Sequence, residues 1–358
     1  MRPLSQILPV VIALILAACS PNQTVSQPNS DLDTITPHQL RAADAAQMVQ
    51  LTELSGHTGA VYSISWSPDG NSLASGSSDG TIRIWDTTTN ELIRAIDAQQ
   101  GSIWGVAWSP TGHQVASVGS EGTATVWDPS TGEMLKTIPV DPAGANIVYC
   151  VAWSPDGTAL AIGASSGAVI IYDPLSGIEI ESWPGHVNGG ISTEVIAIAW
   201  SPDGKSIATG GLDFAIRLWN PTSGTGGPFL RADTLRRNDI NGLAWSPDGL
   251  QLASASQDGV NRIWDPATGM LAHDLGDDGS WKRAIAWSAN GQLLAASGQD
   301  PAIQVWDPTT GELLAELTGH NSPVWSAAWS PDGSRLATGS GNYEIAGGDT
   351  SIRLWGVQ

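Results

Sequence analysis

Short runs of alternating apolar and polar residues, separated by turn-forming residues, fill most of the chain. Val61–Trp66 and Ser72–Gly76 alternate in this way, and the Pro and Gly of Ser67–Gly70 between them suit a β-turn. Thr81–Trp85 has the same character, and a fourth run such as Glu312–Leu317 completes the pattern. The pattern therefore predicts short antiparallel β-strands throughout.

This unit of four strands occurs seven times. A Trp-Ser-Pro-x-Gly signal, degenerate in its sixth copy, recurs at intervals of 42 to 47 residues, beginning at Trp66, Trp108, Trp153, Trp200, Trp245, Trp287 and Trp329. An apolar-Trp-Asp signal or a variant of it follows each copy, at Trp85, Trp127, Tyr172, Trp219, Trp264, Trp306 and Trp355. Four strands in each such interval are typical of one blade of a β-propeller.

The repeat explains an unusual composition. The 358 residues include 17 Trp against 4 Tyr and 2 Phe, and the two signals account for 13 of the Trp. With 41 Gly and 22 Pro the chain is turn-rich, yet it is not of low complexity. Its formal charge of −20 opposes binding to DNA, RNA or anionic lipid surfaces, so we expect no nucleic-acid partner.

The repeated motifs resemble those of the WD-repeat family. Four motifs appear in a fixed order: G-H, W-S-P-D-G, L-A-S-G-S-x-D-G and I-R-I-W-D. The resemblance covers residues 48–358. It implies an all-β fold, a single seven-bladed β-propeller. The last copy ends after Trp355 without a fourth strand, whereas Gln50–His57 matches Glu312–His320. We therefore expect the N-terminal segment to supply the outer strand of blade 7, which would leave no unpaired sheet edge.

His57, Ser75 and Asp79 resemble a hydrolase triad, but the same constellation recurs in other blades. The family resemblance implies buried structural tetrads instead, made of His57, Ser75, Asp79 and Trp85; His186, Thr209, Asp213 and Trp219; and His320, Thr338, Asp349 and Trp355. Two blades depart from this pattern, because blade 3 has Ile162, Ser166 and Tyr172 and blade 6 has Ala296 and no equivalent His. We expect these two blades to open first on denaturation.

Motifs for cofactor chemistry are missing from the sequence. The six His and two Cys form no paired ligand motif for a metal, and no phosphate-binding or dinucleotide-binding glycine loop occurs. We therefore expect no metal, no cofactor and no enzymatic activity.

The N-terminus has the pattern of an exported lipoprotein. Arg2 precedes the apolar run Ile7–Ala18, which is too short to span a bilayer and is typical of a secretory signal. Leu16–Cys19 resembles the lipobox of bacterial lipoproteins, which implies a signal peptide at residues 1–18, a lipidated Cys19, a flexible tether at residues 19–47 and attachment to the cell envelope. The alternative is an ordinary signal peptide with a chance cysteine. Cys150, flanked by apolar residues, is interpreted as a buried structural thiol.

Candidate binding residues gather at positions that WD-repeat proteins place on the top rim of the central channel. They are Tyr62, Trp104, Tyr149, Asp239, Asn241, Trp281, Arg283, Trp325 and, in the blade 7 insertion, Tyr343. Lys282–Arg283 and Arg236–Arg237 would form a small basic sector beside them; the alternative is that the nearby Asp233, Asp239, Asp277 and Asp278 neutralise it. Trp183, by contrast, aligns with Leu317 and is expected in the core. Aromatic residues and Arg are enriched in interface hot spots; the alternative is that these rings only plug the channel mouth.

The sequence therefore predicts a non-enzymatic protein-interaction scaffold, anchored by lipid, that binds an unidentified protein through its top face. One alternative is an accessory lipoprotein of an envelope assembly machine. Another is a sugar-binding or hydrolytic propeller that uses Asp239 with Glu194 at the channel mouth. A component of a larger array without a discrete ligand is a third.

Overall fold

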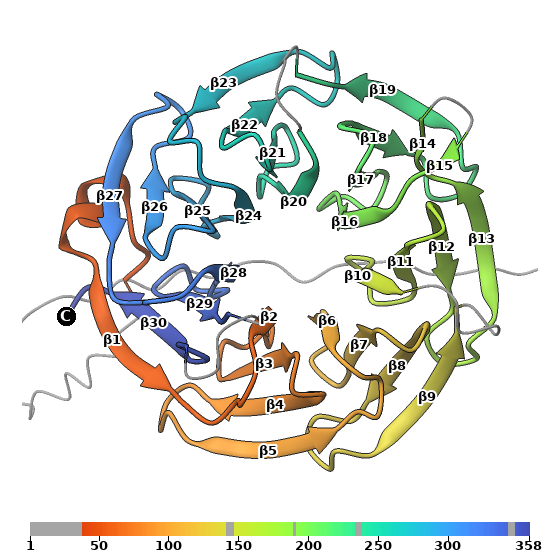
Figure 1. Ribbon diagram of the computed structural model, residues 1–358, viewed down its shortest axis with the longest axis horizontal. Helices are drawn as coiled ribbons and strands as arrows, with labels where there is room; N and C mark the ends of the chain where they lie inside the picture. The colour runs from red at the N-terminus through yellow and green to blue at the C-terminus, as the bar shows by residue number, and fades with distance from the viewer. Residues whose placement is uncertain (1–37, 141–146, 189–190, 233–237, 343–347) are drawn as a thin grey trace, which may run out of the picture. The chain divides into compact units, whose positions relative to one another are not determined.

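The computed structural model describes residues 38–140, 147–188, 191–232, 238–342 and 348–358. Within them, seven four-stranded antiparallel sheets surround a central channel as the blades of a propeller (Figure 1). The predicted all-β, seven-bladed fold is confirmed. The described helical structure is a single 3-10 helix, η1 (Ala42–Gln47), and no helix found there has the length and apolar character needed to cross a membrane.

The first six blades run from the inner to the outer strand in chain order. Blade 1 is β2 (Val61–Trp66), β3 (Ser72–Ser77), β4 (Thr81–Asp86) and β5 (Leu92–Asp97), and blade 2 is β6 (Ile103–Trp108), β7 (Val115–Gly119), β8 (Thr123–Trp127) and β9 (Met134–Pro139). Blade 3 is β10 (Val148–Trp153), β11 (Leu160–Ala164), β12 (Ala168–Tyr172) and β13 (Glu179–Pro184). Blade 4 is β16 (Val195–Trp200), β17 (Ile207–Gly211), β18 (Ile216–Trp219) and β19 (Gly226–Leu230), and the short hairpin β14 (Val187–Asn188) and β15 (Ile191–Ser192) precedes it. Blade 5 is β20 (Ile240–Trp245), β21 (Leu252–Ser256), β22 (Asn261–Trp264) and β23 (Leu271–Leu275), and blade 6 is β24 (Lys282–Trp287), β25 (Leu294–Gly298), β26 (Ile303–Trp306) and β27 (Leu313–Leu317).

The seventh blade contains the first and the last strand of the described chain. Its inner strands are β28 (Val324–Trp329), β29 (Leu336–Ser340) and β30 (Ile352–Gly356), and its outer strand is β1 (Val49–Leu54). Val49 lies opposite Gly356, and Leu54 lies opposite Ile352. Figure 1 shows β1 running along the outside of β30.

The repeated inner-strand Trp residues connect successive blades. Six of these seven residues, all of them described, donate an indole N–H to a backbone carbonyl of the preceding inner strand. Trp66 donates to the Ala328 carbonyl at 3.0 Å and so joins blade 1 to blade 7. Trp108 is the exception, since it donates to the Gly112 carbonyl of its own blade. Each bond contributes about 1 kcal/mol, and the set spans six of the seven blade junctions.

The core lies between the faces of adjacent blades, so the second strand of each blade is buried on both sides. Small residues allow this approach. A Cβ added to Gly76 in β3 would lie 2.6 Å from the Ile103 side chain of the next blade. Trp183 is 8% exposed and packs in the core between blades 3 and 4, as expected.

The three predicted tetrads are continuous hydrogen-bonded chains. In blade 1 the two His57 ring nitrogens lie 2.9 Å from Asp79 and 2.8 Å from Ser75, and Trp85 donates to Ser75 at 2.9 Å. The tetrads of His186 and His320 have the same geometry. Although burial alone would raise it, hydrogen bonds and the charge of His57 hold the pKa of Asp79 well below its ordinary value. Blade 6, in contrast, leaves the buried Trp306 indole nitrogen with no partner among the described residues.

The packed region begins earlier than residue 48, where the sequence pattern placed the end of a tether. Leu40 and Ala45 are 2% and 0% exposed and join the core of blades 6 and 7. The Leu40 N–H donates to the Gly333 carbonyl at 3.0 Å, and the Asn290 side chain donates to the Leu40 carbonyl at 2.9 Å. The prediction was wrong here because one Leu in a polar run carries little periodic signal.

Candidate functional site at the channel mouth

One end of the channel opens into a cavity of about 620 Å³. The second residue of every inner strand contributes to its wall, and these residues are Tyr62, Trp104, Tyr149, Ile196, Asn241, Arg283 and Trp325. In all seven described inner strands the pairing register shifts at this residue. A β-bulge leaves its extra residue outside the ladder and redirects the side chain. The fold therefore presents seven side chains at the mouth without constraining what they are.

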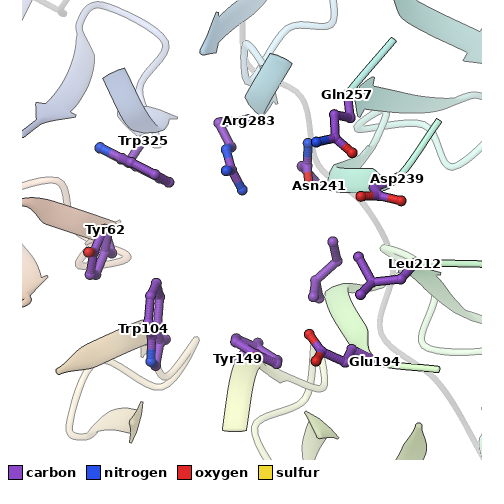
Figure 2. Close-up of a pocket in the computed structure, with 11 residues that line it drawn as sticks. Tyr62, Trp104, Tyr149, Glu194, Leu212, Asp239, Asn241, Gln257, Arg283 and Trp325 are labelled. Atoms are coloured by element: carbon purple, nitrogen blue, oxygen red, sulfur yellow. The ribbon is translucent and has the colours of Figure 1, made fainter. Parts of the chain in front are cut away.

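Aromatic rings form one side of the cavity (Figure 2). Tyr62 and Trp104 stack with centroids 4.4 Å apart and an interplanar angle of 12°. Trp325 meets Tyr62 edge-on at 5.1 Å, and Tyr149 meets Trp104 edge-on at 5.8 Å. The indole of Trp325 donates to the Gly341 carbonyl at 2.7 Å, and that of Trp104 donates to Ser120 at 3.1 Å. The rings are thus fixed before any ligand arrives.

Arg283 extends this aromatic side, because its guanidinium lies 4.6 Å from the ring centroid of Trp325. The expected basic sector is otherwise not formed by the described residues. Lys282 is buried and pairs with Asp278 at 2.5 Å, so its charge is compensated, and Arg236–Arg237 lie outside the described residues. The alternative given by the sequence, neutralisation by a nearby Asp, is therefore what the structure has at Lys282.

The opposite side holds the polar and acidic side chains of Glu194, Asp239, Asn241 and Gln257, with the apolar Leu212 between Glu194 and Asp239 (Figure 2). Burial and the neighbouring Glu194 raise the pKa of Tyr149 to about 12, so its hydroxyl stays protonated and donates to Glu194. The Gln257 side-chain oxygen is buried and has no hydrogen-bond partner among the described residues.

The structure brings seven predicted rim residues into one cavity: Tyr62, Trp104, Tyr149, Asp239, Asn241, Arg283 and Trp325. Trp281 does not line it, which corrects the prediction; the ring is 43% exposed and lies beside Arg283, outside the cavity wall. Tyr343 lies outside the described residues, as does Cys19.

Sequence reasoning did not identify Ile196, Leu212 and Gln257 as wall residues. Ile196 stands four residues before its repeat Trp, as Tyr62 does, so the alignment held this signal. Leu212 and Gln257 each stand 12 residues after theirs, where the other five blades have Ser, Gln or Gly. Leu212 and Gln257 reach the mouth from the residue that follows the second strand, whereas Gln299 at the same offset in blade 6 does not line the cavity.

The cavity can hold an elongated group with an apolar body and a hydrogen-bond-donating or cationic end. Among the described residues, no group of three or more His, Cys, Asp or Glu is placed to hold a metal ion. The hydroxyls of the three tetrads are buried away from the mouth and already hydrogen-bonded. This arrangement is suited to binding.

Comparison with known proteins agrees with the repeat structure. The family described as "WD domain, G-beta repeat" matches residues 48–86, 90–128, 132–173, 177–220, 232–265, 272–307 and 311–356. Among curated proteins, the chain is 39% identical over 84 residues to ribosome biogenesis protein YTM1 of Yarrowia lipolytica, covering 23% of the chain and 16% of that protein. It is 40% identical over 52 residues to a guanine nucleotide-binding protein subunit beta of Arabidopsis thaliana, covering 14% of each, and 45% identical over 47 residues to small ribosomal subunit protein RACK1y of Oryza sativa, covering 13% of the chain and 14% of that protein. These matches therefore span about a sixth or less of each relative.

Proposed function

Because the chain belongs to the WD domain, G-beta repeat family, we propose that it is a non-catalytic scaffold that binds a protein partner in the channel-mouth cavity. The observation that carries this proposal is the two-sided cavity wall, with ordered aromatic rings facing carboxylates and amides. Relatives named as a subunit of a guanine nucleotide-binding protein and as a ribosomal subunit protein are parts of assemblies, which supports it.

The partner segment offers an apolar side chain and a Lys, an Arg or another donor. Its apolar part packs against Trp104 and Trp325, and its donor meets Glu194 and Asp239 across the cavity. A sugar is less well supported, because the stacked rings of Tyr62 and Trp104 cover one face of each other and Arg283 covers part of Trp325.

A cross-linked pull-down from envelope membranes tests this proposal. The Trp104→Ala, Trp325→Ala double variant is compared with wild type, and Trp281→Ala serves as a matched control because this Trp lies outside the cavity wall. Melting curves establish that each variant is folded. We expect one protein to be recovered by wild type and the control and lost with the double variant, and the purified pair to bind at least about tenfold more weakly when both rings are removed. Recovery of the same proteins by all three chains would refute the proposal and favour a plug. Recovery of envelope assembly components would identify the accessory-lipoprotein role.

The anchor is part of the same proposal: Cys19 carries lipid and tethers the propeller at the bacterial cell envelope. Small residues directly before Cys19 support it. We expect an alkyne fatty acid supplied to expressing bacteria to label the wild-type chain and not a Cys19→Ser variant. The mass of the mature N-terminus should correspond to cleavage before Cys19, and an unmodified chain of either length would refute the anchor.

A further inference from the structure

The junction between blades 6 and 7 holds a peptide segment that belongs to neither blade. Leu40, Ala45 and Met48 form one apolar cluster with side chains of both blades, and Leu40 is anchored through Gly333 and Asn290. Gly333 and Asn290 lie in the turns that follow the inner strands of blades 7 and 6, at the end of the propeller opposite the channel mouth. The molecule thus contains one blade junction that already receives a segment with a large aliphatic residue.

The junction between blades 3 and 4 is an open groove of about 480 Å³ built from equivalent positions. Counted from the repeat motifs, its apolar residues Ala159, Ile171, Ile180, Trp200 and Pro221 correspond, in that order, to Leu293, Val305, Leu314, Trp329 and Val357. All five counterparts belong to, or pack against, the cluster that contains Leu40. The two junctions are therefore the same surface, covered in one case and open in the other.

One difference in sequence separates this groove from the other junctions. Six residues after the inner-strand Trp, blades 3 and 6 carry Ala159 and Leu293, whereas the other blades carry Ser, Gln or Arg at this position. Ile180 is 54% exposed, although its counterpart Leu314 packs against the occupied cluster. Ile93, at the same position in the groove between blades 1 and 2, is 47% exposed. The groove has the apolar lining of an occupied junction without an occupant from the described chain.

Charge distinguishes the two junctions, whereas the resident segment itself carries Arg41 next to Leu40. Asn290, which donates to the Leu40 carbonyl, is replaced by Asp156 in the open groove, and Ala315 is replaced by Glu181. A carboxylate cannot donate to a carbonyl and instead favours a cation. We propose that the groove between blades 3 and 4 binds a short segment of a protein partner that carries a large aliphatic side chain next to Lys or Arg. This site is separate from the channel mouth and does not depend on the function proposed there.

The experiment uses the full chain and a labelled peptide of residues 39–48, in which Arg41 stands next to Leu40. Fluorescence anisotropy should show saturable binding below about 1 mM. Ile180→Asp should weaken binding at least about tenfold, because it places a carboxylate in the apolar wall, whereas Met270→Asp, an equally exposed change outside this groove, should leave it unchanged. Both positions are exposed, so both variants should fold.

Two further arms test the charge and the location. A peptide with Arg41→Gln should bind several-fold more weakly than the peptide of residues 39–48, and Asp156→Asn with Glu181→Gln should remove the difference, since Asn290 shows that Asn makes the same turn. A photoreactive Leu at position 40 of the peptide should cross-link to blades 3 and 4. Absence of saturable binding, equal binding of both peptides, or cross-links only to blades 6 and 7, as exchange with the resident segment would give, would each overturn the proposal.

Discussion

Blade 6 lacks one hydroxyl that five other blades have, and supplying it by mutation should stabilise the propeller. The Trp306 indole nitrogen is buried and unpartnered among the described residues because Ala296 stands opposite it. In the described blades 1, 2, 4, 5 and 7 a Ser or Thr at the equivalent position accepts this hydrogen bond at 2.8 to 2.9 Å. Ala296→Ser should supply the acceptor, and its own O–H can donate to the Gln304 carbonyl, as Ser75 does to Arg83.

The expected gain is about 1 kcal/mol, the net value of one buried hydrogen bond. For a domain of this size it corresponds to a rise of about 2 °C in Tm. Hydrogen exchange measured by mass spectrometry should show slower exchange in β25 and β26. Ser254→Ala in blade 5 removes the same bond and is the matched control; it should destabilise the protein by about 1 to 3 kcal/mol.

A double-mutant cycle separates the new bond from general packing effects. Trp306→Phe should cost about 1 kcal/mol more in the Ala296→Ser background than in wild type, because only there does it break a hydrogen bond. Equal costs, or a Ser variant no more stable than wild type, would refute the reasoning.

The remaining predictions concern the tetrads, the N-terminal segment and the free thiol. Burial lowers the pKa of His57, so this side chain resists protonation in the native chain. The protein therefore loses stability as pH falls below about 6.5, because His57 of the unfolded chain takes up a proton there. His57→Gln, which copies Gln100 of blade 2, should flatten the fall in Tm between pH 7 and 5. An unchanged pH profile would contradict this account. Leu40→Ala should lower the free energy of unfolding, measured by urea titration, by about 2 to 3 kcal/mol. The control Leu51→Ala, on the exposed edge of β1, should lower it by less than about 1 kcal/mol. Equal losses would show that Leu40 is not a core residue. Cys150 is partly buried, and burial raises the pKa of its thiol to about 12. In a chain whose other cysteine is replaced by serine, iodoacetamide should therefore alkylate it much more slowly before unfolding than after, and equal rates would contradict this account.

The fold and most of the site could be predicted because seven copies of one unit align on their own Trp motifs. That alignment placed Trp104 and Trp325 on the same rim as Tyr62, and the structure has them in contact. It could not place features that occur once. Leu40 packs in the core although its surroundings are polar, because its burial depends on tertiary contacts at one blade junction rather than on a period. Leu293, a large apolar residue where five blades carry polar residues and blade 3 carries Ala159, was the signal in the sequence that something covers blade 6.

The copies also show which positions the fold constrains and which it leaves free. On the second strand of each blade, buried on both faces, the repeats vary among small and aliphatic residues, since anything larger would meet the next blade. The second residue of each inner strand lies at a bulge, outside the ladder. At this position the seven copies hold two Tyr, two Trp, an Ile, an Asn and an Arg. Because the bulge removes the requirement for pairing, folding alone does not account for four rings and a cation gathered on neighbouring blades. Glu194 and Asp239, on the other side, each stand two residues before a bulge residue. The division of the mouth into two chemical sides is therefore the strongest argument that this surface binds a partner and does not merely close the channel.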